Sequence, residues 1–191
     1  MKPSIRDDFP LLSRRVDGRP LVYLDSAATS LKPTPVLDAE QRFSTAFTAN
    51  IHRGKHLLSE EASSAYEDAR RHVARFIGAV PDEVVFTRNA TEAINIVASG
   101  LGLRPDDKVV TLTNDHHSNQ VPWMRTATVV PYRSDPTEPV SAQQLAEFVD
   151  RTKPRVLALS QASNVTGLVQ PVREICDAIR GLGVLIVVDA A

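Results

Sequence analysis

The sequence lacks the features that mark several large classes of protein. Its 191 residues include one cysteine, Cys176, which excludes an intrachain disulfide and every multi-cysteine zinc or iron–sulfur site within this chain. The longest apolar runs, such as residues 184–188, are far too short to span a bilayer. The opening residues MKPSIRDDFPLLSRR contain no apolar stretch of the kind found in signal peptides. These absences predict a cytoplasmic protein without a membrane partner.

An excess of one charge is also missing. Lys and Arg together number 22 and Asp and Glu 23, so the formal net charge is -1. This balance leaves no basic surface for nucleic acid, and we expect no nucleic-acid partner. The hydrophobic fraction of 42% and the charged fraction of 24% are ordinary for a globular protein, which excludes wholesale disorder. The length suits one domain with a sizeable core, or one large and one small part.

A regular alternation from residue 84 onward predicts the fold class. Short β-branched runs at 84–87, 108–113, 128–133, 155–160 and 185–190 alternate with amphipathic stretches. Strands that alternate with helices predict an α/β domain with a mostly parallel sheet and flanking helices. Ser141 and Gln144 have the spacing of a capping box, and Pro171 suits the first position of a helix. We assign residues 81–191 to this domain.

The first eighty residues have a different pattern and form a separate N-terminal segment, 1–80. Residues 23–28 predict a short strand and a turn, and residues 34–48 and 59–77 predict amphipathic helices, the second ending at Gly78. Between the helices lies NIHRGKHLL, which has no clear period. A polar, irregular segment between two helices is a common place for functional residues.

Unusual side chains follow the predicted strands, in loops 88–95, 114–123, 160–167 and 188–191. Ligands of open α/β sheets bind at the carboxyl ends of the strands, where these loops begin. Asn89, Ala90 and Thr91 precede or open a helix, and they are either an anion site or a plain N-terminal cap. Asp189 ends an apolar strand, so its carboxylate either pairs with a cation or accepts backbone hydrogen bonds.

Histidine and cysteine give weaker signals. His116 and His117 are adjacent, and His52 and His56 lie in HRGKH, which lacks the glutamate of a zincin helix. We therefore predict no metal site. Cys176 falls within an apolar helical pattern, which favours core packing over catalysis.

Six segments in order carry a resemblance to a known family: YLDSAATS, NIHRGKHLLS, FTRNATEAIN, DHHSNQVPW, QASNVTG and VVDAA. Together they resemble the class V aminotransferase-type enzymes that use pyridoxal 5'-phosphate (PLP). The opening IRDDFPLLSRRVDGRPLVYLD resembles the Suf-type cysteine desulfurase and selenocysteine lyase branch. The resemblance implies the large domain of a fold-type I PLP-dependent transferase. It also implies the conversion of cysteine to alanine with release of transferable sulfur.

The resemblance assigns roles to individual residues. Thr91 and the backbone of Ala90 match the phosphate-binding turn, and His116 matches the histidine that stacks on the pyridine ring. Asp189 matches the carboxylate that pairs with the pyridine nitrogen, and Asn164 matches the amide near the ring hydroxyl. Two further pairs match a substrate-pocket segment and a region near the active site and dimer interface: Ala27 with Ala28, and His52 with Arg53.

The chain resembles only the N-terminal half of such an enzyme. None of its lysines (Lys2, Lys32, Lys55, Lys108 and Lys153) matches the family's Schiff-base lysine, and its cysteine does not match the nucleophile. We therefore expect an incomplete large domain with an exposed sheet edge, no C-terminal small domain, and no covalent link to PLP through a matching lysine. The chain is then inactive alone or completed by a second chain.

Several alternatives stay open at this level. The chain could be a non-catalytic truncated fragment or an interaction module, or half of a selenocysteine lyase, epimerase or aminotransferase. As partners we expect a second copy or a complementing C-terminal half, an amino-acid substrate, and a sulfur-acceptor protein.

Overall fold

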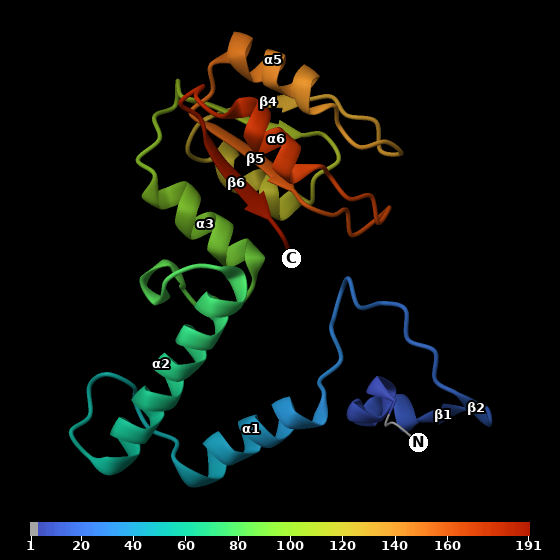
Figure 1. Ribbon diagram of the computed structural model, residues 1–191, viewed down its shortest axis with the longest axis vertical. Coiled ribbons are helices and arrows are strands. Elements are labelled where there is room, and N and C mark those ends of the chain that lie inside the picture. Colours follow the sequence, from blue (N-terminus) through green and yellow to red (C-terminus); the bar gives the residue numbers. More distant parts are fainter. Residues whose placement is uncertain (1–3) are drawn as a thin grey trace. The chain divides into compact units, whose positions relative to one another are not determined.

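The computed structural model describes residues 4–191, which divide between Phe86 and Thr87 into two compact units. Figure 1 shows a smaller set of helices and short strands in the N-terminal unit, and a sheet with flanking helices in the C-terminal unit. Each unit is described below by itself.

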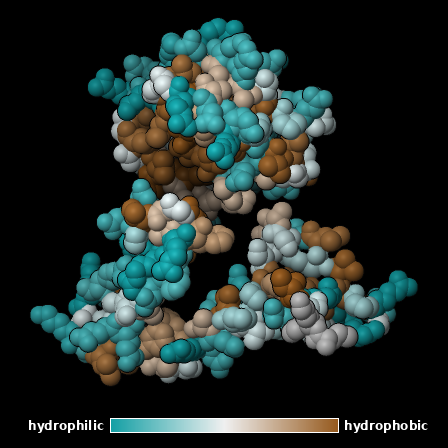
Figure 2. Space-filling model, in the orientation of Figure 1, coloured by the Kyte–Doolittle hydropathy of each residue, from teal (hydrophilic) through white to brown (hydrophobic). Residues whose placement is uncertain are grey.

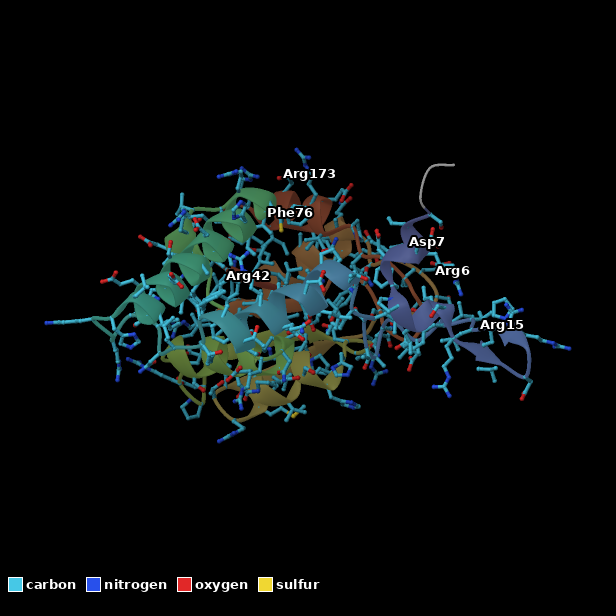
Figure 3. All side chains as sticks on the ribbon, turned by 90° about the horizontal axis from the view of Figure 1, so that it is seen from below. Arg6, Asp7, Arg15, Arg42, Phe76 and Arg173 are labelled. Atoms are coloured by element: carbon cyan, nitrogen blue, oxygen red, sulfur yellow. The ribbon has the colours of Figure 1, made fainter. Side chains whose placement is uncertain are left out.

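The N-terminal unit opens with short elements. These are η1 (Ile5–Asp8), η2 (Pro10–Ser13), β1 (Arg15–Val16) and β2 (Arg19–Pro20). The antiparallel pair β1–β2 is joined by Asp17 and Gly18, both with positive φ, as a tight hairpin turn requires. Arg6 projects from η1 (Figure 3) and donates hydrogen bonds to the carbonyls of Leu12 at 3.2 Å and Leu21 at 2.7 Å. One guanidinium thus ties three consecutive segments together.

Two helices and a short turn complete this unit. They are α1 (Thr34–Ala46), α2 (Leu57–Ile77) and η3 (Pro81–Glu83). α2 ends at Gly78, whose φ of 74° places it in the left-handed region that favours glycine. The turn predicted within 23–28 is confirmed at residues 26–28, but the strand predicted with it and the strand predicted at 84–87 are wrong. No described residue pairs with either segment in a ladder, and a segment without a ladder partner is not a strand.

The C-terminal unit is built on four parallel strands in the order β4-β3-β5-β6. The strands are β3 (Lys108–Leu112), β4 (Thr128–Tyr132), β5 (Val156–Ser160) and β6 (Leu185–Asp189). Val109 lies opposite Val156 across the β3–β5 pair, and Ser160 lies opposite Asp189 across the β5–β6 pair. The carboxyl ends of β5 and β6 are therefore level.

Helices cover both faces of this sheet (Figure 1). Along β5, Leu157 and Leu159 pack into the cluster with α5 (Ala142–Thr152) and α6 (Val172–Ile179), while Val156 and Ala158 pack into the cluster with α3 (Ala90–Gly100) and Trp123. Alternate side chains of a strand point to opposite faces, so a strand buried on both sides needs apolar residues throughout. The α/β fold with a parallel sheet is confirmed.

Two smaller differences from the sequence-based expectation concern the start of α6 and the segment after β3. Pro171 is the N-cap of α6 and not its first residue. The loop predicted at 114–123 contains a 3-10 turn, η4 (His117–Asn119), and its last residues begin a short helix, α4 (Val121–Met124). Pro122 within this stretch cannot donate a helical hydrogen bond, which favours short turns.

One edge of the sheet carries exposed apolar side chains. β6 pairs with β5 on one side only, and its Leu185 and Val188 are 46% and 36% exposed. Figure 2 shows hydrophobic surface over this strand. Within residues 4–191, no helix is both long enough and apolar enough to cross a membrane.

Candidate functional site

A cavity of about 180 Å³ opens at the carboxyl ends of β3 and β5. His116 and Asp115 reach it from the loop after β3, Ser160 from the end of β5, and Asn164 from the loop that follows. These loops meet because parallel strands end at the same edge of the sheet. The cavity therefore combines an imidazole, a carboxylate, a hydroxyl and an amide.

His116 is held by its neighbours. It caps η4, where its Nδ1 accepts a hydrogen bond from the backbone N–H of Ser118 at 3.2 Å, and the Ser118 Oγ lies 2.6 Å from the same Nδ1. Thr91, in the first turn of α3, donates its hydroxyl proton to Ser118 Oγ at 3.0 Å. Two residues predicted for the site, Thr91 and His116, are thus linked through Ser118.

Asp115 joins three parts of the site. Its carboxylate accepts hydrogen bonds from the backbone N–H of Ser160 at 3.0 Å and of Leu112 at 3.4 Å, and from the amide of Asn119 at 3.5 Å. Burial is the main cause that raises the pKa of Asp115, and the negative charge of Asp189 acts in the same direction. Hydrogen bonds from Ser160 and Leu112 offset part of this effect. The carboxylate fastens the His116 loop to the end of β5.

Asp189 is half-buried at the end of β6 and lies opposite Ser160. Its Oδ1 accepts a hydrogen bond from the backbone N–H of Ala191 at 3.1 Å. Within residues 4–191 no Lys, Arg or His forms an ion pair with it. Of the two partners considered from the sequence, a cation or a backbone hydrogen bond, the described residues provide only the backbone hydrogen bond.

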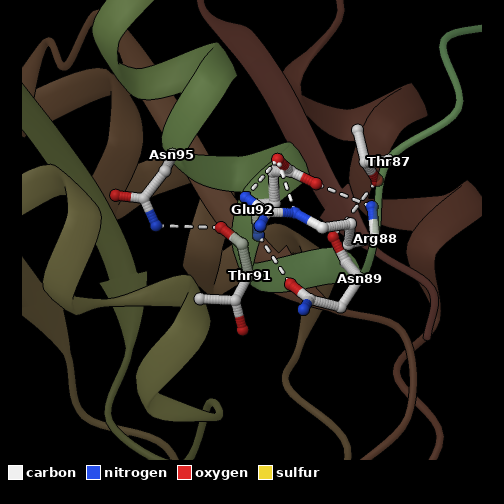
Figure 4. A network of polar contacts seen from close by, with 6 residues as sticks. All are labelled: Thr87, Arg88, Asn89, Thr91, Glu92 and Asn95. Carbon is white, nitrogen blue, oxygen red and sulfur yellow. Dashed lines mark hydrogen bonds and ion pairs between the residues drawn. The ribbon is translucent and has the colours of Figure 1, made fainter.

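The N-terminus of α3 is capped by Asn89, whose side chain accepts a hydrogen bond from the Glu92 N–H at 2.9 Å (Figure 4). Arg88 makes an ion pair with Glu92 at 2.8 Å, and this contact lowers the pKa of Glu92. The plain cap considered from the sequence is therefore present. Ala90 and Thr91 follow it as the first two residues of the helix, and no described residue accepts a hydrogen bond from either N–H.

The remaining candidates lie in the N-terminal unit. His52 has a φ of 65°, unusual for a residue with a side chain, and its Nε2 lies 3.2 Å from the Glu67 carboxylate. Its backbone N–H donates to Ser63 Oγ at 2.9 Å. Arg53 is exposed in the same loop. Ala28 closes a turn through its N–H to the Asp25 carbonyl at 3.2 Å, with Ala27 inside that turn.

Sequence reasoning missed Asp115 and Ser118. Asp115 had a usable signal, because it is a carboxylate directly after a buried strand, as Asp189 is. Ser118 had no such signal, since its role depends on a turn that folds its hydroxyl back onto His116.

Cys176 is a half-buried free cysteine within α6. The described part of the chain contains no group of three or more side chains able to hold a metal ion.

The chain matches known proteins along nearly its whole length. The sequence profile of the family described as aminotransferase class-V matches residues 22–191. A probable cysteine desulfurase of Synechocystis sp. is 40% identical, over 98% of this chain and 46% of that protein. A cysteine desulfurase of Yersinia pestis is 43% identical, over 98% and 48% respectively. The chain thus spans about half the length of the curated relatives it matches.

Solved structures agree with these matches. The apo structure of a cysteine desulfurase from Thermococcus onnurineus NA1 has a TM-score of 0.88 at 34% identity, covering 98% of this chain and 46% of that one. The cysteine desulfurase CsdA from Escherichia coli has a TM-score of 0.76 at 33% identity, covering 96% and 47%. Because the profile match alone covers most of its residues, the chain belongs to the aminotransferase class-V family.

Proposed function

We propose that this chain is the PLP-binding half of a cysteine desulfurase. The observation that carries the proposal is the convergence of His116 and Asn164 on one cavity, beside the Ser160–Asp189 pair at the ends of β5 and β6. The relatives at 40% and 43% identity are named cysteine desulfurases, which favours this chemistry over that of a lyase, an epimerase or an aminotransferase.

The residues of the site fit the chemical groups of PLP. Asp189 has no cationic partner among residues 4–191, and a protonated pyridine nitrogen would supply one. The N–H groups of Ala90 and Thr91 open a helix of 11 residues, where a phosphate is stabilised by the helix dipole. His116 offers an aromatic face, and Asn164 an amide for the ring hydroxyl.

Each of these residues has a separate task in the proposed reaction. PLP supplies a ring that accepts the negative charge developed on an amino-acid substrate. Asp189 keeps a proton on the ring nitrogen, which strengthens that capacity. His116 fixes the orientation of the ring, and Asp115 fixes His116 by fastening its loop to β5. The N-terminal end of α3 anchors the phosphate.

The lysines of the C-terminal unit support the view that the chain is incomplete as a catalyst. Lys108 opens β3, and its Nζ donates to the carbonyl of Thr152 at 3.3 Å. Lys153 precedes β5 and pairs with Asp150 at 2.5 Å. Both lie at the amino-terminal edge of the sheet, opposite the cavity. We therefore propose that the Schiff-base lysine and the sulfur-accepting cysteine come from outside these 191 residues.

We propose a second copy of the chain or a complementing C-terminal half as the partner, with His52, Arg53, Ala27 and Ala28 near the shared active site. A sulfur-acceptor protein would take the product. The cytoplasmic location stays a prediction from the sequence. The alternative of a non-catalytic interaction module would leave the cavity residues without a task.

Complementation in trans tests the proposal. The chain is co-expressed with the second half of the Synechocystis sp. relative, and alanine formed from cysteine is measured in the purified complex with PLP. We expect alanine formation by the parent complex and a large loss in Asp189→Ala. A PLP-loaded complex that forms no alanine would contradict a desulfurase function.

A further inference from the structure

We propose that Ser118 is a positioning residue that fixes the neutral tautomer of His116, with the proton on Nε2 and the lone pair on Nδ1. Ser118 contacts the ring twice: its backbone N–H donates to Nδ1 at 3.2 Å, and its Oγ lies 2.6 Å from the same atom. Both contacts fall on one nitrogen, so the two edges of the imidazole differ in their surroundings.

The direction of the hydrogen bonds follows from the backbone contact. A neutral imidazole has one nitrogen that donates and one that accepts. The Ser118 N–H can only donate, so Nδ1 is the acceptor and carries no proton. The short Oγ–Nδ1 contact is then a hydrogen bond from the serine hydroxyl to the ring, because no proton is left on Nδ1 to point the other way.

Thr91 extends this chain of donors by one member. Its hydroxyl donates to Ser118 Oγ at 3.0 Å, and the Ser118 hydroxyl donates in turn to His116 Nδ1. The two hydroxyl protons run in the same direction, from α3 toward the ring. Within residues 4–191 no hydrogen bond to His116 Nε2 is formed, and His116 lines the cavity. The ring edge that carries the proton is therefore the one left for a ligand.

This inference concerns the site of the proposed function but does not depend on PLP, because the tautomer is set by the chain itself. It assigns His116 the role of a hydrogen-bond donor through Nε2, and it makes that role independent of Thr91. If Thr91 turns its hydroxyl toward a bound phosphate, Ser118 still has its own proton for Nδ1. A purely structural cap of η4 would also need Nδ1 as an acceptor, but it would not need the serine hydroxyl.

Nitrogen NMR of the chain labelled with ¹⁵N-histidine tests the tautomer. Two-bond ¹⁵N–¹H correlations are recorded at pH ~8.5, about two units above the ordinary pKa of an imidazole. The His116 signals are assigned by their loss in His116→Gln. We expect the parent chain to show Nε2 protonated and Nδ1 unprotonated. A proton on Nδ1 in the parent would overturn the proposal.

Variants separate positioning from folding. Ser118→Ala keeps the backbone N–H that donates to Nδ1, so Nε2–H should remain the major tautomer. Loss of the hydroxyl donor should raise the minor Nδ1–H form roughly fivefold relative to the Nε2–H form, as expected for the loss of one hydrogen bond. Ser118→Thr should restore the parent ratio, and Thr91→Val should leave it unchanged. If Ser118→Ala does not fold, Ser118→Cys, with its weaker donor, should give an intermediate ratio. Equal ratios in the parent and in the folded alanine or cysteine variant would overturn the role of Ser118.

A parallel titration with PLP distinguishes this inference from the proposed function. If PLP does not bind to the parent chain, the cofactor proposal fails while the tautomer result stands. If PLP binds but the tautomer ratio does not respond to Ser118, the positioning role fails and the cofactor proposal stands.

Discussion

The Asp115 carboxylate accepts a hydrogen bond from the backbone N–H of Ser160 at 3.0 Å, although the two residues are 45 positions apart in the chain. Asp115 follows β3 and directly precedes His116, while Ser160 ends β5 and lies opposite Asp189. This contact therefore holds the loop that carries His116 against β5. Asp189, the candidate partner of the pyridine nitrogen, ends the neighbouring strand β6.

Removal of the Asp115 carboxylate should weaken the C-terminal unit. In Asp115→Ala the N–H groups of Ser160 and Leu112 lose their shared acceptor, and each unsatisfied buried donor costs about 1–3 kcal/mol. Urea unfolding followed through Trp123, which is fully buried, measures the free energy of unfolding. The matched control is Asp106→Ala, because Asp106 is exposed and forms no side-chain hydrogen bond or ion pair within residues 4–191. Equal stability of the two variants would show that the hydrogen bonds of Asp115 do not stabilise the C-terminal unit.

The same residue predicts a pH dependence. The pKa of Asp115 lies above its ordinary value of 3.8 in the folded chain, so the folded state binds the proton more tightly than the unfolded state does. The contribution of this group to stability is then greatest below about pH 3.8 and is lost as the pH rises through the folded-state pKa. Asp115→Asn does not titrate, so the parent should lose stability relative to this variant as the pH rises through that window. A constant difference between the two would contradict the raised pKa.

Gly54 should not tolerate a side chain. The structure places Ser59 Oγ where a Cβ on Gly54 would lie, and the same Oγ accepts a hydrogen bond from the Gly54 N–H at 3.1 Å and donates to the Asn50 carbonyl at 2.6 Å. We expect Gly54→Ala to displace Ser59 and to speed amide hydrogen exchange in residues 50–63, with a loss of about 1–3 kcal/mol from overpacking. Gly100→Ala is the control, since a Cβ there meets no atom within 4 Å. Unchanged hydrogen exchange in Gly54→Ala would show that the contacts of Ser59 with Gly54 and Asn50 do not hold this loop in place.

The sheet and its helices were predictable because each strand is apolar on both faces. In β5, every residue from Val156 to Ser160 is buried, and such a run between turn signals has few other solutions. The strand predicted at 84–87 was wrong because it has no neighbouring strand to pair with among the described residues. Its β-branched residues meet the local preference for a strand, but a ladder also needs a neighbour, and that is a tertiary property.

The candidate site was predictable where residue type and position in the fold agree. Asp189 stands at a strand end, where a carboxylate is conspicuous among apolar neighbours. The roles of His116 and Asn164 came from a family resemblance and not from their spacing. The links that hold these residues, Asp115 to Ser160 and Ser118 to His116, depend on the path of loops and on side-chain rotamers. Neither the path of a loop nor a side-chain rotamer leaves a periodic pattern in the sequence.

The most direct test of the account is the affinity of the chain for PLP, measured by equilibrium dialysis, with Asp189→Ala, His116→Ala and Cys176→Ser as variants. Loss of a hydrogen bond to a charged group costs about 1.5–3 kcal/mol, so Asp189→Ala should weaken binding by roughly 10- to 150-fold. Loss of ring stacking costs about 0.5–1.5 kcal/mol, which gives roughly 2- to 10-fold for His116→Ala.

Cys176→Ser should bind PLP as the parent does, because Cys176 lies in α6 and does not line the cavity. Pyridoxal without its phosphate should bind more weakly than PLP. The account predicts saturable PLP binding with the order of damage Asp189, then His116, then Cys176. PLP binding that is unchanged in Asp189→Ala, or lost in Cys176→Ser, would contradict the central claim that the carboxyl edge of this sheet holds the cofactor.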